Sequence, residues 1–175
     1  MQTIEANCLP PRDRHDQVHD LGSGSNVLET VTGSGRLITD AKCRVGSTGI
    51  GVSIDACSRF LSIDLPLTLR SRRLDPNDVL SKCMNLLDSD FVDRVREIAG
   101  ALRTYDYTLV IRRLITVPAD ERDDIFPKLR ALLTPKGLII VNMSAHFKAD
   151  LSATNDSTPM QFLAPVSQPR LYRGA

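Results

Sequence analysis

Two hydrophobic periodicities alternate along the chain. Short apolar, β-branched runs predict buried strands at Gln17–Leu21, Asn26–Val31, Ile50–Ile54, Tyr107–Ile111 and Leu138–Val141. Apolar positions three and four residues apart predict helices at Arg36–Val45 and Asp120–Leu133, and each ends at a glycine-containing stop. This alternation predicts an α/β fold: a single Rossmann-like domain with a mostly parallel, twisted sheet flanked by helices and a shortened C-terminal edge.

Other segments are less regular. Asp75 followed by Pro76 is typical of a helix start, and the apolar stripe that follows ends at Leu87. We expect a strand near Arg94–Ala99, and an irregular insertion at 56–74 because Pro66 interrupts any long helix. Residues 1–16 form an extended lead-in to a domain at 17–175. The tail offers two short edge strands at Met160–Leu163 and Arg170–Tyr172.

Composition narrows the function classes. The chain has 175 residues, a formal net charge of +1, no Trp and 5% aromatic residues, so we expect no nucleic-acid partner and no membrane surface. It has no apolar run long enough for a transmembrane span and no signal-peptide core at its start. Four cysteines without metal-ligand spacing indicate reduced, buried thiols and no metal site. A cytoplasmic location is favoured, with a mitochondrial one as the alternative.

Glycine-rich turns and acids mark the first crossover. Asp20-Leu21-Gly22-Ser23-Gly24 is one candidate turn, Thr32-Gly33-Ser34-Gly35 is a second, and Asp55 ends the strand at 50–54. Glycines let a backbone approach a ligand, a following helix start offers free N–H groups, and an acid can accept hydrogen bonds from a ribose. In a parallel sheet such a ligand site lies outside the carboxyl ends of the strands, where we also expect Gly100 and residues 115–118.

These segments carry a resemblance to a known family. VHDLGSGS at 18–25, IGVSIDA at 50–56, DRVREIAG at 93–100 and LRALLTPKGLIIV at 129–141 resemble class I S-adenosylmethionine-dependent methyltransferases. The first is similar to the D-L-G-[SC]-G-x-G-R signature of a small group that includes mitochondrial protein-lysine methyltransferases. The resemblance implies an S-adenosylmethionine cofactor and methyl transfer to a protein substrate, with lysine as the favoured acceptor.

The resemblance also implies roles for individual residues. Asp20 would end the first strand and steady the methionine end of the cofactor, and Asp55 would bind both ribose hydroxyls. The predicted cofactor-binding set is Asp20, Gly22, Ser23, Gly24, Gly35, Asp55 and Gly100. No catalytic residue is assigned, because displacement at a sulfonium methyl depends mainly on positioning. The sequence gives no prediction of the oligomeric state.

Alternatives stay open at this point. The preferred frame starts at Asp20; in the other frame Glu29 is the strand-end acid and residues 32–35 form the turn, which puts Val31 where the first glycine is expected. Ala101 stands where the family often has an acid, so a non-catalytic binding or assembly protein is a second function. A nicotinamide dinucleotide oxidoreductase is a third, since a glycine turn and a ribose acid would serve it equally.

Overall fold

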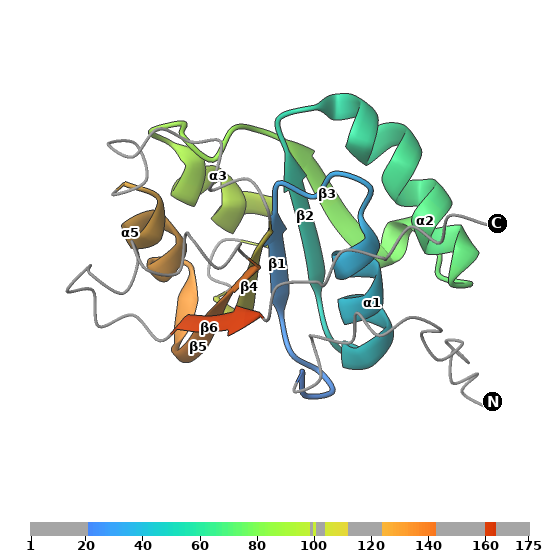
Figure 1. Cartoon of the computed structure of the whole chain (residues 1–175), viewed down its shortest axis with the longest axis horizontal. Helices are drawn as coiled ribbons and strands as arrows, with labels where there is room; N and C mark the ends of the chain where they lie inside the picture. Colours follow the sequence, from blue (N-terminus) through green and yellow to red (C-terminus); the bar gives the residue numbers. More distant parts are fainter. Residues whose placement is uncertain (1–20, 99, 101–103, 112–123, 143–159, 164–175) are drawn as a thin grey trace, which may run out of the picture.

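The structure is a computed structural model, which describes residues 21–98, 100, 104–111, 124–142 and 160–163. Its strands form one six-stranded sheet in the order β3-β2-β1-β4-β5-β6, and every neighbouring pair is parallel (Figure 1). The strands are β1 (Val27–Thr30), β2 (Gly51–Asp55), β3 (Val79–Cys83), β4 (Tyr105–Ile111), β5 (Leu133–Asn142) and β6 (Met160–Leu163). The predicted α/β, Rossmann-like fold is confirmed.

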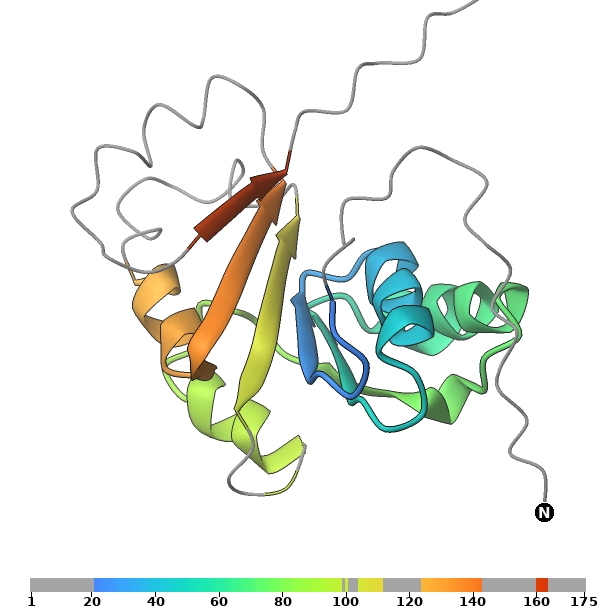
Figure 2. The same ribbon diagram turned by 90° about the horizontal axis from the view of Figure 1, so that it is seen from below.

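Helices cover both faces of this sheet. On one face lie α1 (Arg36–Val45), a π-helical turn η1 (Phe60–Asp64) and α2 (Leu65–Ser71); on the other lie α3 (Phe91–Ile98) and α5 (Ile125–Arg130), as Figure 2 shows. Successive strand residues point to opposite faces, so Val27 packs in the α1 and α2 core while Leu28 packs in the α3 and α5 core. Both side chains are fully buried. Because alternate strand residues are buried on opposite faces, the sheet is covered by helices on both sides and the fold has three layers.

The strand order reverses between β1 and β4. The chain leaves β1 for α1 on one face of the sheet, whereas α5, the next described helix after β4, lies on the other face (Figure 2). Connections that depart to opposite faces open a crevice outside the carboxyl ends of these two strands. The topology therefore selects the carboxyl end of β1 as the position for a ligand.

The buried Lys42 stabilises the C-terminal end of α1. Gly46 follows the helix with φ 71° and ψ −164°, a conformation open essentially to glycine, and so acts as the predicted glycine stop. The Lys42 amine donates to the carbonyl oxygens of Gly46 at 3.0 Å and Gly49 at 2.7 Å, and burial lowers the pKa of Lys42, with Asp78 opposing that change. These bonds fix the connection from α1 to β2 at the amino edge of the sheet.

Two predicted elements have the wrong secondary structure. Asp75 does cap a helix, with a complete capping box to Asp78, but that helix is the single 3-10 turn η2 (Pro76–Asp78) and the chain continues as strand β3. Pairing with β2 overrides the helical spacing of the apolar residues there. The strand expected near Arg94–Ala99 is helix α3, because Phe91 and Val95, four residues apart, share its buried face.

The segment at 56–74 is not an irregular insertion. It forms η1 and α2 as one helical run, and Pro66 lies inside that run directly after the π-helical turn, a distortion of the kind that accommodates a residue without an N–H. Leu61, Leu65 and Leu69 are buried against α1 and the sheet. The lead-in at 1–16, the strand start at 17–20, the tail strand at 170–172 and residues 115–118 lie outside the described residues.

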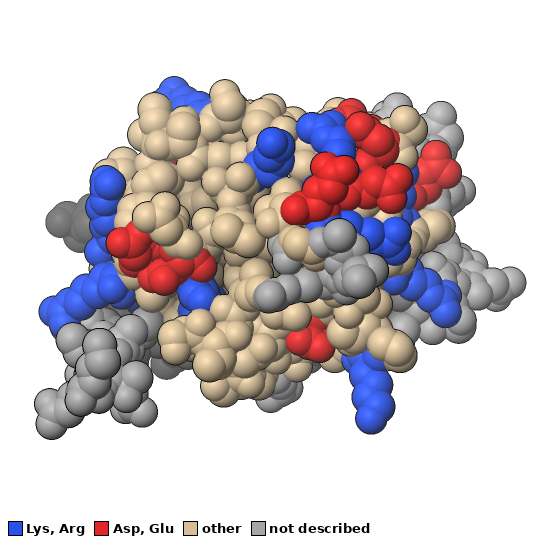
Figure 3. Space-filling view, turned by 180° about the vertical axis from the view of Figure 1, so that it is seen from behind, with Lys and Arg blue, Asp and Glu red and all other residues tan. Residues whose placement is uncertain are grey.

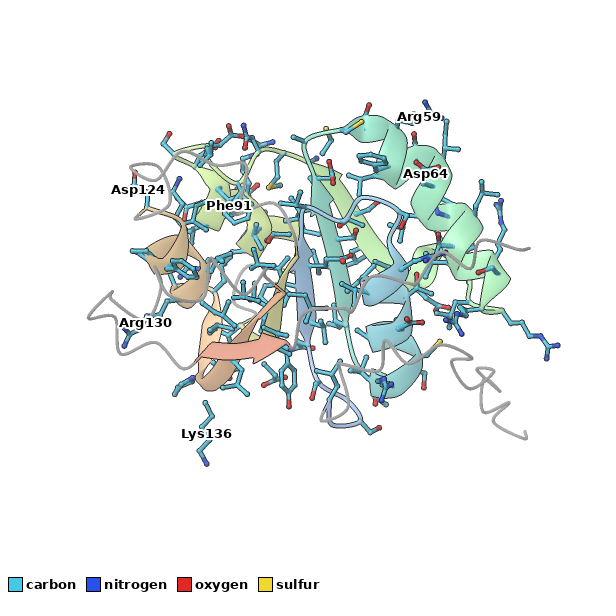
Figure 4. The ribbon with its side chains drawn as sticks, in the orientation of Figure 1. Arg59, Asp64, Phe91, Asp124, Arg130 and Lys136 are labelled. Atoms are coloured by element: carbon cyan, nitrogen blue, oxygen red, sulfur yellow. The ribbon has the colours of Figure 1, made fainter. Side chains whose placement is uncertain are left out.

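Polar contacts fix the start of α3 and tie it to α5. Arg94 pairs with Asp88 at 3.1 Å and Asp90 at 3.5 Å, within the acidic group that Figure 3 shows over α3. The Lys128 amine of α5 donates to the carbonyl oxygens of Leu87 and Asp88, both at 3.0 Å. Surface ion pairs contribute little to stability, so the buried Phe91 at the start of α3 is the main anchor here (Figure 4).

Candidate ligand site at the carboxyl ends of β1 and β2

A glycine turn joins β1 to α1 at the switch point. The Gly35 N–H donates to the Thr32 carbonyl at 3.1 Å, and the Thr39 N–H and hydroxyl both donate to the Gly35 carbonyl, at 3.1 and 2.7 Å. Helix α1 then begins at Arg36 with no side-chain cap and no acid in its first turn. An uncapped helix start of this kind presents its first N–H groups to an anionic or oxygen-rich ligand.

The two glycines of this turn have different functions. Gly33 has φ 55° and a Cβ built on it would meet no atom within 4 Å, so its backbone borders open space. Gly35 has φ 73°, and a Cβ there would lie 2.5 Å from Leu65 Cδ1 and 3.3 Å from Leu65 Cα. Gly35 therefore permits the close approach of α2, and Gly33 leaves backbone accessible to a ligand.

Asp55 fixes the turn to the neighbouring strand. Its Oδ2 accepts from the Gly33 N–H at 2.9 Å and its Oδ1 accepts from the Cys57 N–H at 2.8 Å, while the side chain is buried. From the other side, the Thr68 hydroxyl of α2 donates to the Ser34 carbonyl at 2.7 Å. Each Asp55 oxygen retains a further lone pair, so the carboxylate can still accept ligand hydroxyls.

Glu29 is a second acid beneath the turn. It is 2% exposed, and within the described part of the chain its Oε2 has no hydrogen-bond partner. Burial raises the pKa of Glu29 to about 8. Hydrogen bonds from the Ile38 backbone and the Thr32 side chain lower this pKa, and smaller repulsions from Asp55 and Asp40 raise it further. Glu29 is consequently protonated at neutral pH.

Val31 has a backbone conformation that normally requires glycine. Its φ is 63°, in the left-handed region, where a β-branched side chain is strained. It lies within Glu29-Thr30-Val31-Thr32-Gly33-Ser34-Gly35, at the position of the first glycine in the alternative frame. The chain makes the tight turn of a glycine motif without the glycine.

Replacing Val31 with glycine should stabilise the fold. Relief of the left-handed strain is worth roughly 1–2 kcal/mol, and the added chain entropy of glycine offsets about half of it. We expect the free energy of unfolding in urea to rise by about 0.5–1 kcal/mol. Val31→Ala keeps a Cβ in the same conformation and is the control that should lack the gain; a loss of stability in Val31→Gly would contradict this account of the turn.

The structure separates the predicted site residues into two groups. Gly35 and Asp55 lie together at the carboxyl edge, on either side of Gly33. Gly22, Ser23 and Gly24 precede β1 at the amino edge, where the Gly24 N–H donates to the carbonyl of Val45 at the far end of α1, at 2.8 Å. Gly100 follows α3 and precedes β4, also at the amino edge. Asp20 lies outside the described residues.

The turn of the preferred frame, residues 22–24, therefore lies at the amino edge of the sheet, opposite Asp55. The sequence offered Glu29 and Gly33 only as an alternative, although four consecutive residues from Val27 to Thr30 are buried, as in a central parallel strand.

Among the described residues, no helix is long and apolar enough to cross a bilayer. The same residues contain no group of three or more His, Cys, Asp or Glu that could hold a metal ion.

No family model and no curated protein sequence matches the chain. Solved structures do share its fold. E. coli YjhP matches 71% of the chain at 15% identity with a TM-score of 0.51. A candidate methyltransferase from Thermoplasma acidophilum matches 69% at 16% identity, with a TM-score of 0.50. PKMT2 from Rickettsia typhi in complex with AdoHcy matches 65% at 21% identity, with a TM-score of 0.51.

These likenesses place the chain in a fold class. The matched regions are 44% of YjhP, 44% of the Thermoplasma protein and 19% of PKMT2, so the chain spans less than half the length of each. The shared feature is the Rossmann-like sandwich of methyltransferases, with helices on both faces of a parallel sheet.

Proposed function

We propose that the chain binds S-adenosylmethionine at the carboxyl ends of β1 and β2 and takes part in methyl transfer. The observation that carries the proposal is the 2.9 Å bond from the Gly33 N–H to Asp55 Oδ2, which joins an open glycine backbone to a strand-end carboxylate at the switch point of the sheet. The fold shared with the candidate methyltransferase from Thermoplasma and with PKMT2 bound to AdoHcy supports this ligand.

The residues present fit the nucleoside part of that ligand. Asp55 would accept hydrogen bonds from the ribose hydroxyls with its remaining lone pairs, and the open Gly33 backbone would border the ligand. When bound, the cofactor supplies a methyl group on a positively charged sulfur, which is already activated for displacement. The chain would contribute orientation, by holding the turn from both Asp55 and Thr68.

For the acceptor we propose a protein lysine. This part depends on the resemblance of residues 18–25 to the signature of the lysine group, whose Gly22 to Gly24 lie at the opposite edge of the sheet from Asp55. The expected result is transfer of labelled methyl groups from the cofactor to protein, recovered as methyl-lysine after acid hydrolysis. Label recovered only on other residues or on small molecules would reject lysine and leave cofactor binding standing.

Calorimetry tests the cofactor directly. The parent chain should bind S-adenosylmethionine, and a nicotinamide dinucleotide should not compete with it for the site. Asp55→Ala should abolish binding, and its folding must be verified by circular dichroism because the substitution also removes the bonds to Gly33 and Cys57. No heat with the parent chain would reject the proposal, and tighter binding of the dinucleotide would favour an oxidoreductase.

Val31 favours a second candidate function. A valine at the first glycine position adds a branched side chain to the turn, which could exclude the amino-acid end of the cofactor and leave a binding or assembly protein with the same fold. In that case the parent chain would give no heat with S-adenosylmethionine, and Val31→Gly would restore binding. Turnover of any acceptor by the parent chain would refute this candidate.

A further inference from the structure

Two free cysteines lie beside Asp55. Cys83 is the last residue of β3 and the pairing partner of Asp55 in the sheet, and Cys57 follows Asp55 by two residues. Both side chains are exposed, so the expectation of buried thiols is wrong for these two. Neither thiol contributes to the hydrophobic core, and both are open to reagents in solution.

The backbone brings the two cysteines close together. The Cys83 thiol donates to the carbonyl oxygen of Ala56 at 3.4 Å. That carbonyl and the Cα of Cys57 belong to one planar peptide unit, so the Cys83 sulfur lies next to the backbone that carries Cys57. Asp55 and Cys83 are partners on strands about 4.8 Å apart, and Cys57 follows Asp55 by two residues. Disulfides join Cα atoms roughly 4.4–6.8 Å apart, so the bond requires rotation of both side chains and a shift of Cys57 toward β3.

We propose that Cys57 and Cys83 form a reversible disulfide that weakens ligand binding at Asp55. The oxidant is a low-molecular-weight disulfide such as oxidised glutathione. One protein thiolate attacks it and releases one glutathione; the other protein thiolate then attacks the mixed disulfide and releases the second. Two protein thiols are oxidised, one glutathione disulfide is reduced to two thiols, and their protons pass to the released glutathione. The effect on the ligand rests on the proposed function, but the disulfide does not.

The coupling to the site runs through Cys57. Its N–H holds Asp55 Oδ1 at 2.8 Å, and its carbonyl accepts from the Phe60 N–H at 3.1 Å at the start of the helical run. A bond to Cys83 would draw Cys57 toward β3 and away from the carboxylate, which would then turn relative to the Gly33 N–H. Exposed Arg59, which Figure 4 shows at the start of this run, and exposed Lys82 would attract an anionic oxidant to the pair.

The disulfide is tested in a chain that carries Cys8→Ser and Cys43→Ser, so that only this pair remains. After equilibration with oxidised glutathione, we expect both thiols to disappear, the mass to fall by two hydrogen atoms, and dithiothreitol to reverse both changes. Adding Cys57→Ser to the same background should instead leave a mixed disulfide with one glutathione. Two persisting thiols, two stable mixed disulfides or covalent dimers would each overturn the proposal.

The coupling is tested by two measurements on the same oxidised and reduced samples. Amide hydrogen exchange of residues 32–35 should be faster in the oxidised form, and calorimetry should show S-adenosylmethionine binding at least about tenfold weaker. Unchanged exchange would reject the coupling whether or not the ligand binds. If the reduced chain binds no S-adenosylmethionine, the proposed function fails, while the thiol and exchange measurements still decide the inference.

Discussion

Glu29→Gln should remove a large part of the pH dependence of stability. The pKa of Glu29 is about 8 in the folded chain and 4.5 without burial. Between these values the folded state binds a proton that the unfolded state has lost, so the stability present below pH 4.5 is lost as the pH rises through 8. The loss should total on the order of 4 kcal/mol in the parent chain, and glutamine has no proton to lose.

Urea unfolding at pH 5, 6, 7 and 8 measures this effect. The difference between the parent and Glu29→Gln isolates Glu29 from the other titrating groups, because those are common to both chains. We expect the variant to gain stability over the parent progressively toward pH 8, with the smallest difference at pH 5. Parallel stability curves would show that Glu29 ionises normally and that it is not buried as described.

Gly33→Ala should weaken ligand binding far more than it weakens the fold. A methyl group would project into the open space beside the Gly33 backbone, where the proposed cofactor lies, and we expect at least about tenfold lower affinity. The left-handed φ of 55° adds a stability loss of about 1 kcal/mol. Calorimetry with S-adenosylmethionine and urea unfolding separate the two effects.

Gly46→Ala is the matched control for this substitution. Gly46 also has a positive φ, 71°, and also has no atom within 4 Å of a built Cβ, but it lies at the other end of α1. Gly46→Ala should lose at least as much stability as Gly33→Ala, because the ψ of −164° at Gly46 lies in a region open essentially to glycine, and only Gly33→Ala should lose affinity. Equal affinities in both would place the ligand away from the glycine turn.

Much of the fold could be predicted, because local pattern and tertiary structure agree in most elements. Helix α1 has apolar residues at helical spacing and a glycine stop, and β2 is a short apolar run with Asp55 at its end. The secondary structure was predicted wrongly where a local signal is present but the element that it starts is short. The cap at Asp75 is complete, yet only one 3-10 turn follows it, because pairing of β3 with β2 outweighs helix propensity.

The site was harder to predict than the fold. Gly22-Ser23-Gly24 carries the stronger resemblance, but a glycine turn has a ligand role only at the carboxyl edge, and the sequence does not show which of two adjacent strands is central. Val31 concealed the turn between β1 and α1, because a valine with φ 63° cannot be recognised from residue type. The ties of Asp55 to Gly33 and Cys57 depend on strand register and were not predictable from spacing.

The double hold on the glycine turn has a kinetic consequence. Asp55 binds it from the sheet and Thr68 binds it from helix α2, so the loop already has its ordered shape in the free chain. A preorganised loop loses little conformational entropy on association. Encounter with a small molecule should therefore proceed in a single kinetic phase that scales linearly with concentration, without the plateau that a slow closing step would impose.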